Sequence, residues 1–370
     1  MGSGCRWRLF DCQLTMFGSR PNKAGGRTIE KSKFETIDLD NVAFGTVYSD
    51  HMFFCDFKDG KWQQPEITPY QPLQLDPSAR VFHYGQAAFE GMKAYKDENN
   101  DVWIFRPEQN WERICFSANR LAMPEVPKDV FMDGLKTLLK MDKQWVVPGR
   151  GNTLYIRPFI FATQAGVSAA PAEEYKFMII CTPVQAYYKG GDVKVKISDH
   201  YSRAANGGVG ATKAAGNYAA QFYPTKKANE EGYQQIIWTN STHEYLEEAG
   251  TMNVFFRIGD KLLTAPTDER ILNGVTRKSI ITLAEREGIT VEVRKVSVSE
   301  VIEAAKTGEL KEVFGTGTAA VVVPITGVGY KDDHYDLPKL DSAYSTMLKG
   351  KLLDIQYNEA EDTFGWIQKI

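Results

Sequence analysis

The chain has no excess of basic residues and no long apolar run, and both absences exclude classes of protein. The formal net charge is −3 at pH 7 and no block rich in Lys and Arg stands out, so we do not expect nucleic acid as a partner. No continuous apolar stretch approaches the roughly 18 residues that would suggest a membrane-spanning helix. We therefore expect a soluble protein without a membrane partner.

Cysteine is also scarce, which excludes a disulfide framework. The five cysteines are odd in number and scattered, which favours a reducing compartment and hence the cytoplasm: Cys5, Cys12, Cys55, Cys115 and Cys181. The five histidines do not pair with cysteine at metal-ligand spacing, so we predict no metal.

The first 27 residues are rich in Gly, Arg and Ser and nearly free of acids. We interpret residues 1–27 as a flexible tail. An expression leader and a remnant of an Arg-rich organelle-targeting segment both have this composition, and the sequence does not separate them. If the tail is a targeting segment, the mitochondrial matrix replaces the cytoplasm as the expected location.

Residues 28–187 mix aromatic-rich strands with helices, which predicts a small N-terminal α+β domain. The strands are expected at 44–54, 102–105, 153–157 and 177–182, and the helices at 110–121 and 129–143. The polar stretch 188–192 contains two glycines and is the best candidate for an interdomain linker.

Residues 193–370 predict a second, larger α+β domain, because short strands again alternate with helices. Strands are expected at 193–197, 235–238 and 253–258, the last turning through Gly259-Asp260 into 261–264 as a hairpin, and a helix is expected at 279–287. Ser297-Val-Ser-Glu300 fits a capping box for another helix that ends near Gly308. A cleft between the two domains is then the expected ligand site.

The most informative run is Gly207-Gly-Val-Gly-Ala-Thr-Lys213-Ala-Ala-Gly-Asn-Tyr218. Small residues on both sides of Lys213 let a flat aromatic aldehyde approach the backbone, and a desolvated amine can attack a carbonyl, as a Schiff-base lysine does. A solvated surface lysine and a phosphate-binding loop remain alternatives. A Walker loop is excluded, because Thr212 precedes the lysine and Ala214 follows it.

Five further motifs, in order along the chain, join this run in a pattern that resembles the branched-chain amino acid aminotransferases, which are fold-type IV pyridoxal-phosphate enzymes. The resemblance runs from about residue 40 to the C-terminus. The motifs are His83–Tyr95, Leu154–Pro158, Glu247–Phe255, Asn273–Arg277 and Phe314–Ala320. The resemblance implies pyridoxal 5'-phosphate as cofactor in the cleft between the two domains, with Lys213 as the catalytic lysine.

The same resemblance assigns the cofactor contacts. A carboxylate must face the ring nitrogen, because a pyridoxal ring withdraws electrons well only while that nitrogen is protonated, and the match gives this role to Glu248. Its neighbour Glu247 is expected to be solvated. Tyr218 is expected to bind the ring oxygen, and Arg203 also matches a position near the cofactor. The phosphate is expected to lie at the start of the helix opened by Gly274, with contacts from Arg113, Val275, Thr276 and Thr318.

Substrate contacts follow from the same matches. The glycine-rich turn at 315–320 offers amides for the α-carboxylate, at Thr318 and Ala319. An aromatic wall is expected to hold the side chain, formed by Phe44, Tyr84, Phe89, Tyr155 and Tyr187. The pocket must accept both an aliphatic side chain and the γ-carboxylate of glutamate, which the family manages with a tyrosine and an arginine, here Tyr84 and Arg157.

The implied activity is that of a branched-chain-amino-acid transaminase acting by a ping-pong mechanism. Leucine, isoleucine or valine gives its amino group to the enzyme and leaves as a 2-oxo acid, and 2-oxoglutarate then receives that group to become glutamate. Lys213 is expected to move the α-proton, first as general base and then as general acid. The partners are thus small amino acids and 2-oxo acids.

Two departures from the family pattern are visible. Animal mitochondrial members carry Cys-x-x-Cys just after the Thr-Ala turn, whereas Ala320 and Val323 stand here, so no redox switch is expected at that place. The segment Ala165-Gly-Val-Ser168 resembles a loop that relatives lend to the neighbouring subunit, which implies a homodimer. Relatives often have a larger residue where Ala165 stands, which affects the substrate size that we expect.

Other activities remain open. D-amino acid aminotransferases and aminodeoxychorismate lyase share the same fold and also use a lysine, an acid and a phosphate turn. The runs Glu90-Gly-Met-Lys and Gly250-Thr-Met-Asn favour the branched-chain group. A non-catalytic binding protein is the alternative from another class, although every chemical position named above is intact.

Overall fold

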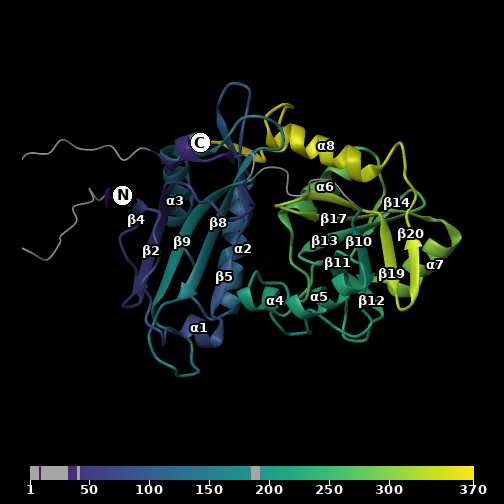
Figure 1. Ribbon diagram of the computed structural model, residues 1–370, viewed down its shortest axis with the longest axis horizontal. Helices are drawn as coiled ribbons and strands as arrows, with labels where there is room; N and C mark the ends of the chain where they lie inside the picture. The colour runs from purple at the N-terminus through teal and green to yellow at the C-terminus, as the bar shows by residue number, and fades with distance from the viewer. Residues whose placement is uncertain (1–7, 10–31, 40–41, 185–191) are drawn as a thin grey trace, which may run out of the picture.

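The computed structural model describes residues 8–9, 32–39, 42–184 and 192–370, which fold into two α+β domains that lie side by side (Figure 1). Within these residues no helix is both long and apolar enough to cross a membrane. Residues 188–191 of the predicted linker and most of the predicted tail, as well as Tyr187, lie outside the described part.

The first domain is built on a sheet of ten strands among the described residues, antiparallel except where β1 joins β4. Helices α2 and α3 pack on it, and the core between them includes Phe53, Phe131, Leu135 and Ile156. The strands are β1 (Arg8–Leu9), β2 (His51–Lys58), β3 (Lys61–Trp62), β4 (Glu66–Pro69), β5 (Ala87–Phe89), β6 (Met92–Lys96), β7 (Val102–Phe105), β8 (Thr153–Ala162), β9 (Tyr175–Val184) and β21 (Ile367–Lys369). The helices are α1 (Arg80–Tyr84), α2 (Pro107–Arg120) and α3 (Lys128–Met141), with 3-10 turns at Lys33–Thr36 and Lys143–Trp145.

The second domain holds a sheet of eleven strands among the described residues, with helices on both sides. The strands are β10 (Lys194–Ile197), β11 (Gln235–Thr239), β12 (Tyr245–Ala249), β13 (Met252–Ile258), β14 (Lys261–Thr264), β15 (Val291–Val293), β16 (Val296–Ser297), β17 (Leu310–Gly317), β18 (Val321–Ile325), β19 (Gly327–Tyr330) and β20 (Asp333–Asp336). The helices are α4 (Ala215–Ala219), α5 (Phe222–Glu230), α6 (Val275–Arg286), α7 (Val298–Thr307) and α8 (Tyr344–Gln356).

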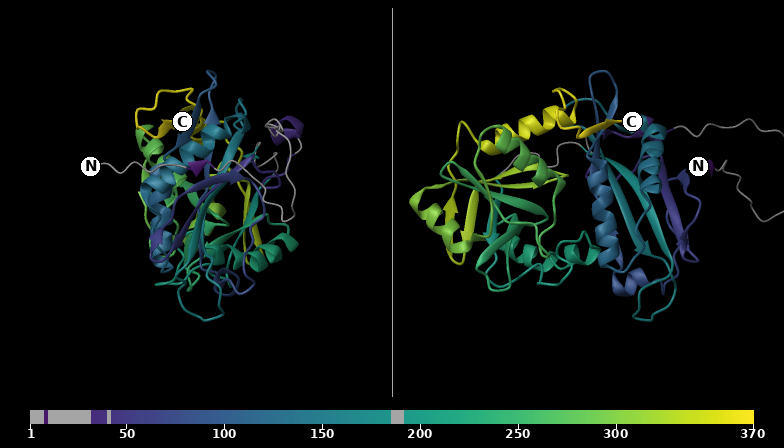
Figure 2. Two further views of the ribbon diagram at one scale, coloured as in Figure 1. Left: turned by 90° about the vertical axis from the view of Figure 1, so that its left-hand side faces the viewer. Right: turned by 180° about the vertical axis from the view of Figure 1, so that it is seen from behind.

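The chain does not end in the second domain. After α8 it returns to the first sheet, where β21 pairs antiparallel with β7 from Ile367 opposite Phe105 to Lys369 opposite Trp103. Figures 1 and 2 show α8 running along one side of the molecule toward the first domain and the C-terminus lying there. The predicted boundary assigned all of 193–370 to the second domain, and β21 is an exception to that division.

Most predicted elements occur, with ends set by local chemistry. Helix α7 begins after Ser297, whose Oγ accepts from the Glu300 amide at 3.1 Å, and ends at Gly308 in the left-handed conformation. The second half of the expected capping box is absent, because the Glu300 carboxylate is held by Arg294. Helix α2 begins three residues earlier than predicted, at Pro107, whose missing amide costs nothing in the first turn.

The predicted strand at 44–54 is wrong over its first half. Thr46 donates its amide to the Ala43 carbonyl at 3.2 Å, and Gly45 has φ +75°, so a turn stands where alternation predicted a strand. Strand β2 begins only at His51. The turn frees Phe44 from the sheet, and its side chain lines the interdomain pocket.

Candidate active site

A pocket of about 750 Å³ is lined by residues of both domains. Helices α4 and α5 lie between the two sheets near it (Figures 1 and 2). All of the predicted site residues except Tyr84, Tyr187 and Arg203 line this pocket. They are Phe44, Phe89, Arg113, Tyr155, Arg157, Lys213, Tyr218, Glu248, Val275, Thr276, Thr318 and Ala319. The structure therefore brings together residues from distant parts of the chain.

The Lys213 side chain lies beside two aromatic rings of the pocket, which contact each other. Its Nζ is 2.9 Å from the Tyr218 hydroxyl and 4.9 Å from the centre of the Phe89 ring. The lysine backbone is fixed from the first domain, because the Phe89 amide donates to the Lys213 carbonyl at 3.1 Å and Ser117 Oγ accepts from the Lys213 amide at 3.0 Å. Ser117 is fully buried on α2. The amine is thus held at a defined place between the domains.

The glycine-rich loop before the lysine is held at several points. Arg120 of α2 donates to the Gly207 carbonyl at 2.6 Å, and the Glu269 side chain accepts from the Gly207 amide at 2.7 Å. At Gly210 a Cβ would collide with Ala204 and with the Arg270 backbone, so only glycine fits. The small residues around Lys213 allow this close packing of two loops.

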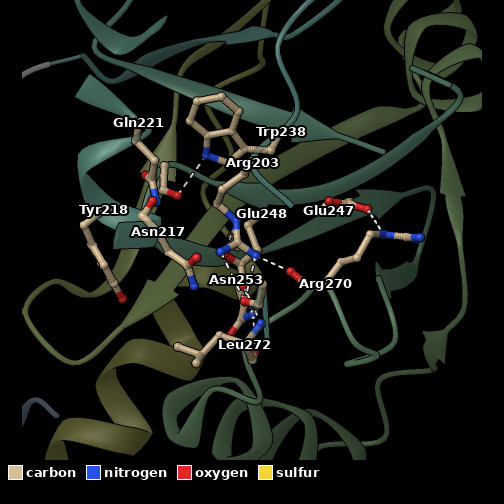
Figure 3. Close-up of polar contacts among 12 residues, drawn as sticks. Arg203, Asn217, Tyr218, Gln221, Trp238, Glu247, Glu248, Asn253, Arg270 and Leu272 are labelled. Carbon is tan, nitrogen blue, oxygen red and sulfur yellow. Dashed lines mark hydrogen bonds and ion pairs between the residues drawn. The ribbon is translucent and has the colours of Figure 1, made fainter. Parts of the chain in front are cut away.

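A buried acid, Glu248, lies on one wall of the pocket, and a buried arginine lies beside it (Figure 3). The Arg203 guanidinium forms an ion pair with Glu248 at 3.2 Å, and Glu248 also accepts from the Leu272 amide at 2.7 Å. Burial raises the pKa of Glu248 above its ordinary value, and Arg203 opposes that shift. Arg203 itself does not line the pocket, and its other contacts are the carbonyls of Gly210 and Arg270.

The expectation that Glu247 is solvated is wrong. Neighbouring residues of a strand point to opposite faces, and the far face of β12 is covered too, so Glu247 is buried. It pairs with Arg270 at 2.5 Å, and burial raises its pKa while Arg270 lowers it. Figure 3 shows this second acid and arginine pair beside the first.

An anion-binding corner lies at the start of α6. Gly274 caps the helix without a side-chain hydrogen bond, so the first amides of α6 face the pocket, and a Cβ at Gly274 would collide with Asn253. Arg113 reaches the same corner and donates to the Asn273 carbonyl at 3.1 Å. Its other nitrogens bind both oxygens of Glu90, at 2.7 and 2.8 Å.

A tight turn at 318–320 joins β17 to β18 on another wall of the pocket. Thr318 Oγ1 donates to the Gly91 carbonyl at 3.1 Å, which ties the turn to the first domain. Within the described residues, the amides of Thr318, Ala319 and Ala320 donate no hydrogen bond. This turn therefore presents free amides to the pocket.

An arginine without an acidic partner lies among the aromatic residues. The Arg157 guanidinium is 4.6 Å from the Phe89 ring centre and 5.3 Å from that of Tyr155, and it donates to the Tyr155 hydroxyl at 3.1 Å. No carboxylate of the described residues forms an ion pair with it, and its Nε is buried without a partner. Phe44 meets Tyr155 edge to face at 5.1 Å.

Tyr84 does not line this pocket. It ends α1, is 43% exposed, and donates to the Val167 carbonyl of the 165–168 loop. Val167 is 66% exposed, and Ala165 of the same loop bridges to Ala79. The predicted tyrosine and the predicted loop are therefore neighbours on the surface. Tyr187 lies outside the described residues.

Several pocket residues have no counterpart in the predicted set. Phe222, Gln235, Thr251 and Asn253 line the pocket, and Glu90 and Ser117 support it from behind. Glu90, Thr251 and Asn253 fall inside the recognised motifs, so their positions in the sequence could have indicated that they belong to the site. The other three contacts join segments far apart in the chain, which no local pattern reveals.

Comparison with known proteins agrees with this geometry. The family model described as amino-transferase class IV matches residues 87–328. Branched-chain-amino-acid aminotransferase 2 of Bacillus subtilis (strain 168) is 41% identical over 90% of this chain and 93% of its own length. A probable branched-chain-amino-acid aminotransferase of Staphylococcus epidermidis is 43% identical over 91% of this chain and 98% of its own length.

Solved structures show the same fold. The branched-chain amino acid aminotransferase of Escherichia coli superimposes with a TM-score of 0.72 at 24% identity, covering 86% of this chain and 98% of that one. The branched-chain amino acid aminotransferase of Thermobaculum terrenum in its PLP form gives a TM-score of 0.70 at 20% identity, over 86% of this chain and 98% of that one. The chain belongs to the class IV aminotransferases, in the group of the branched-chain-amino-acid aminotransferases.

Proposed function

We propose that this enzyme transfers the amino group of leucine, isoleucine or valine to 2-oxoglutarate, with pyridoxal 5'-phosphate as its cofactor. The observation that carries the proposal is one pocket that combines a lysine amine, a buried carboxylate and an anion-binding corner. The relatives that are 41–43% identical over about nine tenths of the chain favour this activity over a D-amino acid aminotransferase or a lyase of the same fold.

The residues of the pocket suit this cofactor. The free amides at the start of α6 and the Arg113 guanidinium offer donors and positive charge to a phosphate, with Val275 and Thr276 at the helix start and the Thr318 hydroxyl nearby. Glu248 offers a carboxylate to a protonated ring nitrogen, and Tyr218 a phenol to the ring oxygen. When bound, pyridoxal phosphate supplies an electron sink for the bonds at the substrate α-carbon.

Lys213 carries the proton in the proposed reaction. Its Nζ takes the α-proton as general base and returns it as general acid, a positioned transfer that supplies on the order of 10²–10⁴ in rate. The Tyr218 hydroxyl at 2.9 Å orients the amine, and the Ser117 and Phe89 contacts hold the backbone that carries it. Arg203 favours the ionised form of Glu248, which otherwise loses charge on burial.

Substrate recognition is assigned to two places. The free amides at Thr318 and Ala319 receive the α-carboxylate of every substrate. The aromatic side chains Phe44, Phe89 and Tyr155 pack against an aliphatic side chain, and Arg157 receives the γ-carboxylate of glutamate or 2-oxoglutarate. Its Nε is buried and without a partner, which supports such an anionic ligand.

We also propose a homodimer in which the 165–168 loop and Tyr84 face the pocket of a second copy. Tyr84 and Val167 are exposed and in contact with each other, and neither lines the pocket of its own chain. Such an arrangement brings Tyr84, which does not line the pocket of its own chain, to the substrate pocket of the second copy.

A coupled assay of purified enzyme tests the proposal. Leucine with 2-oxoglutarate should give glutamate, whereas D-alanine formation from pyruvate would reject the branched-chain assignment. Lys213→Ala should remove turnover and change the visible absorbance of the bound cofactor, while Lys226→Ala, on the exposed side of α5, serves as the matched control. A Lys213→Ala enzyme with full activity would contradict the proposed mechanism.

A further inference from the structure

Lys93 is a buried lysine that neither the site nor the proposed function uses. It lies on β6 of the first domain, is 7% exposed, and donates from Nζ to the Ala319 carbonyl of the second domain at 2.7 Å. Ala319 belongs to the turn whose amides face the pocket. The lysine therefore holds this turn from the first domain.

This ammonium has no acidic partner, although buried charges in proteins are ordinarily paired. Within the described residues no carboxylate lies within ion-pair distance of Lys93. The charged side chain that bears on it is another lysine, Lys349 of α8, and the other titratable side chain around the same small cavity is Tyr95 of β6. An anion is therefore missing from the surroundings of this charge.

The cavity beside Lys93 lies directly behind the pocket. It is about 20 Å³ in volume, and Gly91, Val275, Thr276, Gly317 and Thr318 line both. Lys93 and the Gly91 carbonyl, two residues apart in the chain, thus both hold the turn, one through Ala319 and the other through Thr318. The first domain fixes the turn at two consecutive residues.

We propose that Lys93 is a positioning residue for the α-carboxylate of the substrate, acting through the Ala319 carbonyl to orient and polarise the turn that receives it. A cationic donor on this carbonyl draws electrons from the Ala319–Ala320 peptide and makes the amide of Ala320, which lines the pocket next to Ala319, a stronger additional donor to the carboxylate. The positive charge also attracts the carboxylate through a low-dielectric region. This inference rests on the proposed function, because it concerns the carboxylate of those substrates.

The protonation state of Lys93 is expected to change with pH in the range just above neutral. Burial, with a contribution from Lys349, lowers the pKa of Lys93 to about 8. Below that pH the ammonium supports carboxylate binding, and above it the neutral amine keeps a hydrogen bond but loses the charge. Carboxylate affinity should therefore fall as the pH rises through about 8.

The test is the affinity of the holoenzyme for 4-methylpentanoate, an unreactive carboxylate, measured by calorimetry from about pH 6 to about pH 10. The natural enzyme should lose on the order of tenfold in affinity across this range, the size of one charge-assisted hydrogen bond. Lys93→Arg should keep its affinity to the highest pH, because guanidinium stays charged. Lys93→Met should bind weakly at every pH and raise KM more than it lowers kcat.

Matched controls tie the titration to this side chain. Lys349→Met should move the loss of affinity to higher pH, because it removes a neighbouring positive charge. Lys96→Met, three residues further on the same strand, should keep the natural profile. The neutral analogue 4-methylpentanamide should bind all variants alike.

Two results would overturn the inference. One is a natural enzyme whose 4-methylpentanoate affinity does not change between about pH 7 and about pH 9; the other is a Lys93→Arg enzyme that loses affinity over the same range as the natural one. Neither result requires Lys93→Met to fold. Failure of the proposed function is a separate outcome, seen as a natural enzyme that does not convert leucine and 2-oxoglutarate.

Discussion

The Glu90 carboxylate offers the sharpest test of how the anion-binding corner is built. It is fully buried and accepts both bonds of the Arg113 fork, at 2.7 and 2.8 Å, and a third from Asn110 at 2.7 Å. Burial is the largest single influence and raises the pKa of Glu90, but the charge and hydrogen bonds of Arg113, together with Lys213 and Asn110, lower it overall. Glu90→Gln removes the negative charge and one acceptor, and leaves the Arg113 charge buried beside a neutral amide.

The expected cost is large because one partner of a buried ion pair is removed. Such changes cost about 3–5 kcal/mol, and domains of this size lose about 2–4 °C in Tm per kcal/mol. Glu90→Gln should therefore lower the Tm of the cofactor-free protein by about 6–20 °C. It should also weaken pyridoxal phosphate binding, because the arginine is no longer held toward Asn273 and the start of α6.

A double variant separates stability from cofactor binding. Glu90→Leu with Arg113→Met removes both charges and should recover most of the lost Tm, since no unpaired charge remains. It should not recover cofactor affinity, because the phosphate has lost its cation. Calorimetric melting and cofactor titration by absorbance measure the two effects. A Glu90→Gln enzyme that melts within about 1 °C of the natural one would refute the reasoning.

Two further outcomes are expected. Arg157→Ala should reduce kcat/KM for glutamate on the order of tenfold more than for leucine, since only glutamate has a second carboxylate for the unpaired guanidinium; equal losses for both substrates would contradict this role. The hydrogen bond from His51 to Asp142, at 2.6 Å, raises the pKa of His51. The stabilisation from this pair is therefore complete below pH 6.5, the ordinary pKa of histidine, and it is lost as the pH rises through the raised pKa. The Tm difference between the natural protein and His51→Gln should therefore be larger at about pH 5.5 than at about pH 9, and a difference that is constant with pH would show that the pair contributes no charge-dependent stability.

The sequence predicted those parts of the fold and site that local chemistry determines. The Ser297 cap and the Gly308 end of α7 follow from neighbouring residues, and so does the hairpin through Gly259-Asp260. The residues of the recognised motifs meet in one pocket, as the resemblance implied. Their individual roles remain predictions for the experiments above.

The rest depends on contacts between distant segments. No residue near Glu247 in the chain predicts its ion pair with Arg270, and no residue near Lys213 predicts its hydrogen bond to Ser117, which lies 96 residues earlier. Alternation around Phe44 predicted a strand because the tertiary contacts that favour a turn there are not visible in a short window. Tyr84 matched a family position, but no local pattern predicted that its hydroxyl bonds the Val167 carbonyl, 83 residues away, instead of lining the pocket.

The returning strand β21 has a consequence for the movement of the two domains. The second domain is joined to the first through the chain at its beginning, and at its end the chain pairs with the first sheet through Ile367–Lys369, so both of its ends connect to the first domain. Two tethers leave fewer independent rotations than one, and less orientational entropy remains to be lost when a ligand bridges the cleft. Strand β21, although it is not part of the pocket, thereby helps to keep the two domains in the relative orientation that ligand binding requires.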